Sequence, residues 1–201
     1  MPKAAPEPRQ QATAARLMDA AERLFAEHGL AAVSFRQLAR EAEANVAAVH
    51  YHFGSKEALL EQVLLRRMVP LMAQRTALVR AGLVTPTETL VEAWVRFLVQ
   101  PLVDLIAREG VQGRAYVRLM WRSHSERPEW TEALSTAHAG NDARVFQRWL
   151  RDALPGLAAE QVQVRARLAT RLTFDVLAGN LKANKLIPQL HQFLCAGVGA
   201  E

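Results

Sequence analysis

Apolar residues recur along this chain at the three- and four-residue spacing of one helix face, and glycine, proline and capping residues separate the apolar stretches. The first stretch runs from about Gln10 to His28, and Gly29 follows it as a stop signal. Its apolar positions share one face: Leu17, Ala21, Leu24 and Phe25. Neither strand-like alternation bounded by hairpin signals nor a solenoid-type repeat is present, so the pattern predicts an all-α fold.

Two short helices are expected next, and each begins after a residue type that caps helix N-termini. Ser34 precedes a helix over residues 35–42, and Asn45 precedes one over residues 46–53. Residues 43–45 form the whole connection between them. Because long helices are expected directly before and after this pair, the spacing predicts a helix-turn-helix inside a three-helix head.

The remaining sequence keeps the helical spacing, with prolines and glycines as interruptions. Ser55 caps one helix, and Thr85 or Thr87 starts the next. Pro101 is expected to kink or restart that helix, because proline lacks a backbone N–H. The other expected helices cover residues 56–80, 112–124, 128–153 and 158–183, with a short one after Pro188. The whole chain is expected to hold nine or ten helices.

The helix over residues 46–53 has one apolar face and one face of small and polar residues. Val46, Val49 and Phe53 have the spacing of a packed face. The residues that remain are Ala47, Ala48, His50, Tyr51 and His52. Adjacent alanines allow a backbone to approach a DNA groove closely, and their methyl groups can contact thymine methyls. The alternative is that the tyrosine and histidines only close the head against the following helix.

The formal net charge of +5 hints at a polyanionic partner. However, residues 1–56 hold seven Lys and Arg against six Asp and Glu, so most of the positive excess lies in the remainder of the chain. DNA binding by the head would therefore depend on a few placed groups rather than on bulk charge.

Several classes of protein are disfavoured by the sequence. A single cysteine, Cys195, excludes an internal disulfide framework and a thiolate-rich metal site. We expect neither a metal nor a cofactor, although His138 and Asp142 have a spacing that could chelate an ion. Nucleotide-binding and nucleophile motifs are absent from the sequence, which argues against an enzyme. No apolar run reaches about 18 residues, and Met1 to Gln11 lacks a secretory h-region. We expect a cytoplasmic protein without a membrane partner.

The stretch from Ala20 to Leu60 resembles the DNA-binding head of the TetR family of bacterial transcriptional regulators. The motif residues are Ala21, Leu24, Phe25 and Gly29, then Leu38 and Ala39, and then Tyr51, His52 and Phe53 leading into Ser55, Lys56, Glu57, Ala58 and Leu59. The resemblance implies a helix-turn-helix head on a helical ligand-binding and dimerisation body. It also implies a homodimer that binds a palindromic operator in double-stranded DNA and responds to a small-molecule effector.

The resemblance assigns DNA contacts to particular positions. His52 and Lys56 match phosphate clamps of the family, and His50 stands where many members have tyrosine. The full set of expected DNA-binding residues is Ser34, Arg36, Gln37, Asn45, Ala47, Ala48, His50, Tyr51, His52 and Lys56. One departure lies in the turn, where the family usually has glycine and this chain has Glu43. A left-handed backbone at this residue costs roughly 1 kcal/mol, and its charge lies near the DNA side.

The body is expected to supply a dimer interface and an effector site. Two long helices separated by Pro155 and Gly156 can form a four-helix interface with a second copy, or they can pack only within one chain. The expected interface residues are Phe146, Trp149, Leu150, Ala166, Ala169 and Thr173. Aromatic residues and methionine suit an apolar ligand, although each can instead belong to the core. The expected ligand residues are Trp94, Phe97, Leu98, Tyr116, Met120, Trp121, Phe174 and Leu177.

These patterns predict a tail over residues 1–9 without fixed structure, a DNA-binding domain over residues 10–55 and a ligand-binding and dimerisation domain over residues 56–201. The predicted function is repression of a catabolic or efflux operon. A small apolar effector, of acyl or aromatic type, is expected to release the protein from DNA. The alternative is a helical small-molecule-binding protein or enzyme whose DNA-binding head is degenerate.

Overall fold

The computed structural model describes residues 8–80, 88–179 and 183–200, and within these ranges the chain is helical without strands. The helices are α1 (Pro8–His28), α2 (Phe35–Glu41), α3 (Val46–Phe53), α4 (Lys56–Arg80), α5 (Leu90–Glu109), α6 (Val111–Glu126), α7 (Pro128–Ala153), α8 (Ala159–Ala178) and α9 (Ala183–Gly199). The all-α prediction is confirmed. No helix in the described ranges combines the length and the apolar character that crossing a bilayer would require.

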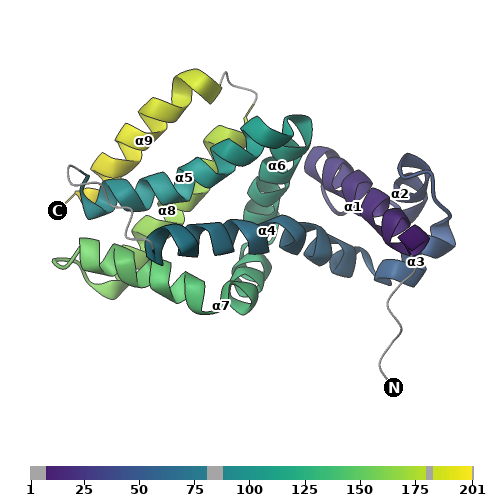
Figure 1. Cartoon of the computed structure of the whole chain (residues 1–201), viewed down its shortest axis with the longest axis horizontal. Helices are drawn as coiled ribbons and strands as arrows, with labels where there is room; N and C mark the ends of the chain where they lie inside the picture. The colour runs from purple at the N-terminus through teal and green to yellow at the C-terminus, as the bar shows by residue number, and fades with distance from the viewer. Residues whose placement is uncertain (1–7, 81–87, 180–182, 201) are drawn as a thin grey trace.

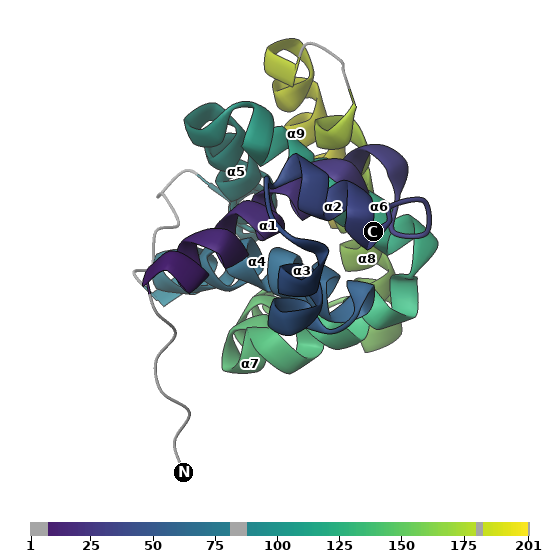
Figure 2. The ribbon, with the colours of Figure 1, turned by 90° about the vertical axis from the view of Figure 1, so that its right-hand side faces the viewer.

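Helices α1 to α3, here called the head, lie together at one end of the molecule, and α4 to α9 form the body (Figure 1). The long α4 runs from the head into the body, and α6 lies beside α1. Viewed from the head end, α2 and α3 stand in front of the body helices (Figure 2). This arrangement leaves one side of the head available to a large partner.

Two hydrophobic clusters hold the fold together. The main cluster includes buried residues from both the head and the body, such as Phe25, Val49, Leu64 and Tyr116. The second cluster lies within the body and includes Trp94 of α5, together with residues from α7, α8 and α9. The main cluster crosses the boundary between head and body. A movement of the head helices is therefore expected to change side-chain packing in the body, and the reverse.

The expected caps of the short helices are present. Ser34 and Gln37 form a reciprocal capping box at the start of α2, and the Asn45 side chain accepts from the N–H of Ala47 over 2.8 Å. Ser55 Oγ accepts from the N–H of Ala58 over 3.0 Å. Gly29 has a φ of +80°, which glycine adopts without steric cost. These local signals explain why the boundaries of α2 and α3 are close to those predicted.

Pro101 lies inside α5 without ending it, so of the two expected outcomes, a kink or a restart, the restart does not occur. Proline has no N–H to donate to the carbonyl four residues earlier, which here belongs to Phe97. The buried Arg75 of α4 supplies the missing donor, because its Nε donates to the Phe97 carbonyl over 3.0 Å and its Nη2 to the Leu98 carbonyl over 2.8 Å. Burial lowers the pKa of Arg75 to about 10, so the side chain stays charged at neutral pH.

Three other boundaries differ from the sequence prediction. Helix α5 begins after Thr89, whose side chain accepts from the N–H of Glu92, whereas the expected starts at Thr85 and Thr87 lie outside the described residues. The long C-terminal helix ends at Ala178, because Gly179 adopts extended backbone angles. Helix α9 then begins at Ala183 and includes Pro188, which was expected to precede it.

Candidate DNA-binding interface

Helix α3 has a packed face and a solvent face. Val49 and Phe53 are buried in the main cluster, and Val46 packs against it. On the opposite face, Ala47, His50 and Tyr51 are exposed at positions i, i+3 and i+4 of one helix surface. Tyr51 is the most prominent of them, with 73 % of its surface exposed. A short helix with a small residue beside an exposed aromatic ring has the shape needed to enter a DNA major groove.

Aromatic contacts orient the polar side chains around this solvent face. The His50 ring meets the Phe35 ring edge-on, with 4.7 Å between centroids, which connects α3 to the start of α2. The Tyr51 ring lies against His52 at 5.2 Å, also edge-on. Ala48 and His52 are half-buried at the sides of the face. The tyrosine is therefore held against a neighbour and still projects outward.

Ser34, Gln37 and Asn45 use their side chains to cap helices. Gln37 Oε1 accepts from the N–H of Ser34 over 2.8 Å, and Ser34 Oγ accepts from the N–H of Gln37 over 3.2 Å. Arg36 lies between them, and its side chain is exposed at the N-terminal end of α2. A cation beside a helix N-terminus favours a phosphate. A DNA contact by any of these residues remains a prediction.

Lys56 lies differently from the expected phosphate clamp. Its Nζ donates to the main-chain carbonyls of Leu30 and Val33, each over 3.1 Å, and to that of Ala31 over 3.4 Å. An ammonium group has three N–H donors, and here three carbonyls of the loop between α1 and α2 face them. This side chain therefore fastens the start of α4 to the α1–α2 loop of the head, and sequence reasoning missed that role because its partners lie 23 to 26 residues away.

Glu43 has a φ of +48°, so the turn between α2 and α3 keeps the left-handed geometry that glycine favours. The N–H of Ala44 donates to the Ala39 carbonyl over 2.8 Å, and the N–H of Glu43 donates to the Arg40 carbonyl over 3.2 Å. These two bonds are the pair expected for a Schellman motif. The turn therefore retains its backbone geometry with a glutamate at the glycine position.

The expected ligand residues are divided between the two hydrophobic clusters. Trp94 and Leu98 belong to the second cluster, whereas four others belong to the main cluster: Tyr116, Met120, Phe174 and Leu177. Phe97 is buried and its ring lies 5.0 Å from that of Trp149. Trp121 is half-buried and donates from Nε1 to Asp175 over 3.0 Å. These residues belong to the packed interior of the described chain, and a role for the set in ligand binding remains a prediction.

Three of the six residues expected at a dimer interface are buried within the chain, and the other three are half-buried. Leu150, Ala169 and Thr173 are buried at 1 %, 2 % and 0 % exposure, so they are unable to form a surface. The remaining three pack against the second cluster: Phe146, Trp149 and Ala166. The burial of Leu150, Ala169 and Thr173 is explained because a stripe of small residues fits close packing inside one chain as well as between two. An interface role for the half-buried Phe146, Trp149 and Ala166 remains a prediction. The exposed apolar side chains of α8 are Val164 and Leu168.

The described residues show no cluster of three or more His, Cys, Asp or Glu side chains arranged to hold a metal ion. Of the pair with chelating spacing, His138 Nδ1 lies 3.1 Å from the carbonyl of Leu134, and the side chain of Asp142 lies outside the described residues.

Comparison with known protein families agrees with this geometry. The model for bacterial regulatory proteins of the tetR family matches residues 17–63, which span most of the head and the start of α4. A model for the tetracyclin repressor-like C-terminal domain matches residues 96–197. The chain belongs to the TetR family. Like other TetR regulators, it is a DNA-binding transcriptional regulator and not an enzyme.

Individual TetR relatives cover nearly the whole chain. The HTH-type transcriptional regulator UidR of Escherichia coli K12 is 28 % identical over 171 residues, which are 84 % of this chain and 81 % of UidR. The fatty acid degradation regulator FadR from Bacillus halodurans has a TM-score of 0.64 at 14 % identity, covering 95 % of this chain and 96 % of FadR. SmeT, the repressor of a Stenotrophomonas maltophilia multidrug efflux pump, has a TM-score of 0.61 at 21 % identity, covering 94 % and 89 %.

Proposed function

We propose that this TetR regulator is a repressor that binds a palindromic operator as a homodimer and leaves it when a small effector binds. The observation that carries the proposal is the solvent face of α3, where Ala47, His50 and Tyr51 are exposed opposite a buried face. Two such heads, related by a two-fold axis, would insert α3 into successive major grooves about 34–36 Å apart. The cytoplasm, which holds bacterial DNA, is the proposed place of action.

Within this proposal, residues 10–55 act as the DNA-binding unit and residues 56–201 as the ligand-binding and dimerisation unit. Support comes from the end position of α1 to α3 and from the length of α4, which connects that end to the body (Figure 1). The two units are distinguished by their proposed functions and not by separate hydrophobic cores, because the main hydrophobic cluster continues across the boundary between them.

The second copy is proposed to dock on the outer surfaces of α8 and α9. Val164 and Leu168 of α8 are 48 % and 62 % exposed, and Phe193 of α9 is 65 % exposed. Val164 and Leu168 are four residues apart and share one helix face. Exposed apolar side chains on neighbouring helices fit a self-complementary interface, since a two-fold axis brings the same surface of both copies together.

The effector is proposed to be a small, mostly apolar molecule that binds in the body near Trp94. This side chain is 2 % exposed, and its Nε1 has no hydrogen-bond partner among the described residues. A buried N–H donor without a partner is costly, so an acceptor atom on a ligand would stabilise it. The names of the structural neighbours FadR and SmeT, a fatty acid degradation regulator and an efflux-pump repressor, favour regulation of a catabolic or efflux operon.

A gel shift with the DNA upstream of the protein's own gene tests the proposal. Wild type should bind one fragment at low salt, and Tyr51→Ala should weaken that binding at least tenfold, because a base contact contributes about 1–3 kcal/mol. Val111→Ala is the matched control, since Val111 is 69 % exposed but lies on α6 in the body. Equal binding by wild type and Tyr51→Ala would refute the assigned DNA-binding face.

A further inference from the structure

A buried carboxylate of the head, Glu22 of α1, is the centre of a polar network that continues into the body. Its side chain has no exposed surface. One carboxylate oxygen accepts from Arg66 over 3.0 Å and from Arg67 over 2.8 Å, both on α4. The other oxygen accepts from Gln112 of α6 over 2.8 Å. A single residue of the first head helix is therefore hydrogen-bonded to two helices of the body.

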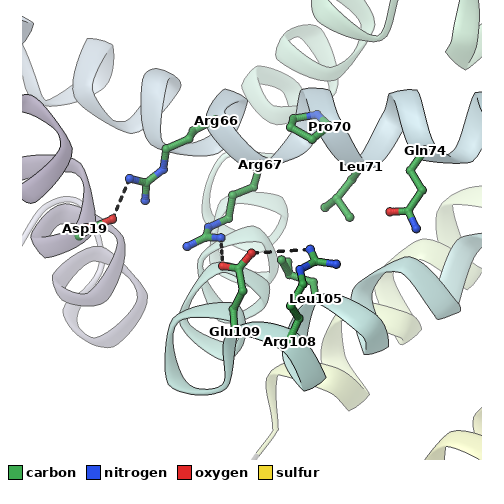
Figure 3. Close-up of a pocket in the computed structure, with 9 residues that line it drawn as sticks. All are labelled: Asp19, Arg66, Arg67, Pro70, Leu71, Gln74, Leu105, Arg108 and Glu109. Carbon is green, nitrogen blue, oxygen red and sulfur yellow. Dashed lines mark hydrogen bonds and ion pairs between the residues drawn. The ribbon is translucent and has the colours of Figure 1, made fainter. Parts of the chain in front are cut away.

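The two arginines of α4 extend this network to further carboxylates. Arg66 also donates to Asp19 of α1 over 2.7 Å, and Arg67 also pairs with Glu109 at the end of α5 (Figure 3). Arg108 lies 3.6 Å from Glu109. Once the buried carboxylate is counted, three arginines face three carboxylates among the described residues. The network is therefore electroneutral, and its charges are matched within the chain.

The body holds its side of the network at the tight corner between α5 and α6. Glu109 is the last residue of α5, Gly110 follows with a φ of +56°, and Gln112 lies in the first turn of α6. Gly113 lets the two helices pack closely, since a Cβ there would lie 2.7 Å from the carbonyl oxygen of Leu105. The two network groups on this corner are thus held in place by close-packed backbone.

Such a network fixes a direction, which apolar packing alone does not. Hydrophobic burial is non-directional, so the main cluster is compatible with small rotations of the head. Hydrogen bonds between guanidinium and carboxylate groups have defined distances and angles. Removal of two opposite charges from water is costly, so replacement of a buried pair by apolar side chains often leaves stability unchanged. A change of head orientation at preserved stability is therefore the specific signature of a network that determines geometry.

We propose that Glu22 is a positioning residue for operator recognition, because its bonds to Arg67 and Gln112 set the angle between the head and the body. Each head then presents α3 in one direction, and two heads present their α3 helices at one spacing. This consequence for the operator rests on the proposed homodimer, whereas the fixed angle within one chain does not. Glu22 is buried away from DNA and acts only through α1.

Distances between spin labels on the head and the body, measured without DNA, test the angle directly. The labels are attached after Ala15→Cys on α1 and Glu160→Cys on α8, two exposed positions, in a Cys195→Ser chain diluted with unlabelled protein. Dilution restricts the measurement to distances within one chain. We expect one narrow distance distribution when Glu22 is present, and at least a twofold broader one after Glu22→Met with Arg67→Met. This double variant should unfold at a urea concentration close to that of wild type, because apolar side chains of similar length fill the space.

Three further variants separate orientation from stability. Glu22→Gln keeps an acceptor oxygen for the arginines but loses the charge, so the distribution should stay narrow while the urea midpoint falls. Gln112→Met removes only the donor from α6, at a half-buried position, so the protein should fold and the distribution should broaden. Arg167→Gln with Glu132→Gln breaks an exposed ion pair within the body and should change neither quantity.

The role of Glu22 would be overturned by a narrow distribution in the folded double variant or in Gln112→Met. It would equally be overturned if the width followed the loss of stability across the whole series. Gln112→Met decides alone if the double variant does not fold.

The operator supplies a second readout that a loss of stability alone would not move. One base pair inserted between the half-sites turns them by about 35° and separates them by about 3.4 Å. Wild type should bind the native operator at least tenfold more tightly than this lengthened one, and Glu22→Met with Arg67→Met should reduce that ratio to about threefold or less. An unchanged ratio would refute the consequence for the operator. Absence of any operator complex with wild type would instead refute the proposed function, and the label distances would still decide the role of Glu22.

Discussion

The Nε of Arg122, on α6 of the body, donates to the main-chain carbonyl of Ala26 in the last turn of α1, over 2.9 Å. The Nη2 of the same side chain donates to the carbonyl of Glu27 over 2.8 Å. Carbonyls at a helix C-terminus lack intrahelical partners and carry partial negative charge, so this cation is an effective cap. A body side chain therefore fixes the end of the first helix of the head.

Replacement of Arg122 by Met should loosen this connection. The variant retains an apolar stem but loses the donors, and we expect the free energy of unfolding to fall by about 2 kcal/mol, as for hydrogen bonds to a charged group. Urea denaturation followed by circular dichroism measures the change. Arg114→Met, at an exposed position of the same helix, is the control and should change stability little. Equal effects of the two substitutions would contradict the capping role.

Arg36 and Lys56 should differ in their effects on DNA binding. Arg36 is exposed, so Arg36→Gln should lower the salt dependence of DNA affinity by about two units per dimer, as expected for one phosphate contact on each head. Lys56 is engaged with three carbonyls, so Lys56→Gln should leave this slope unchanged and should destabilise the protein by about 1–3 kcal/mol. Anisotropy titrations at several salt concentrations, with urea melts, measure both effects. A reduced slope in Lys56→Gln would show that the ammonium contacts phosphate.

Glu43→Gly should stabilise the head. The residue has a φ of +48°, and glycine relieves the steric cost of that geometry by about 1 kcal/mol. Glu43→Ala is the matched control, because it removes the same charge and keeps a Cβ. Thermal unfolding should rank the glycine variant above the alanine variant, and an equal or reversed ranking would contradict the strain at this turn.

The caps of α2 and α3 could be predicted because a cap depends on residues two or three positions apart, as with Ser34 and Gln37. The roles of Glu22 and Lys56 could not, because their partners come from other parts of the chain. Glu22 is an acidic residue on the buried face of α1. Its buried carboxylate is stabilised by hydrogen bonds from two arginines that lie 44 and 45 positions later in the chain. Periodicity also could not decide whether Ala169 and Thr173 pack within one chain or between two.

His124 should make stability depend on pH. Burial is the main reason that the pKa of His124 is lowered, with nearby Arg171 acting in the same direction and Glu132 and the Met120 carbonyl opposing it. Below the unfolded-state pKa of about 6.5, the unfolded chain binds a proton that the folded chain does not, so folding weakens as pH falls. Denaturation at pH 7.5 and 5.5 should show this loss in wild type, at up to about 1.4 kcal/mol per pH unit.

The matched variants for this pH dependence are His124→Gln and His28→Gln. His124→Gln should show a smaller decrease in stability between the two pH values, even if its stability at pH 7.5 is reduced by altered packing on Phe174. His28→Gln, at an exposed position at the end of α1, should keep the wild-type decrease. The same pH dependence in His124→Gln and wild type would exclude His124 as its source.

The central claim is that two copies of this chain present two α3 helices to one operator. Native mass spectrometry of the protein with the upstream duplex identified by gel shift tests it most directly. We predict a complex of two chains and one duplex for wild type, and its loss in Leu168→Glu, which places a charge at a side chain 62 % exposed on α8. A complex of one chain and one duplex, or an unchanged two-chain complex with Leu168→Glu, would contradict the proposed dimer surface.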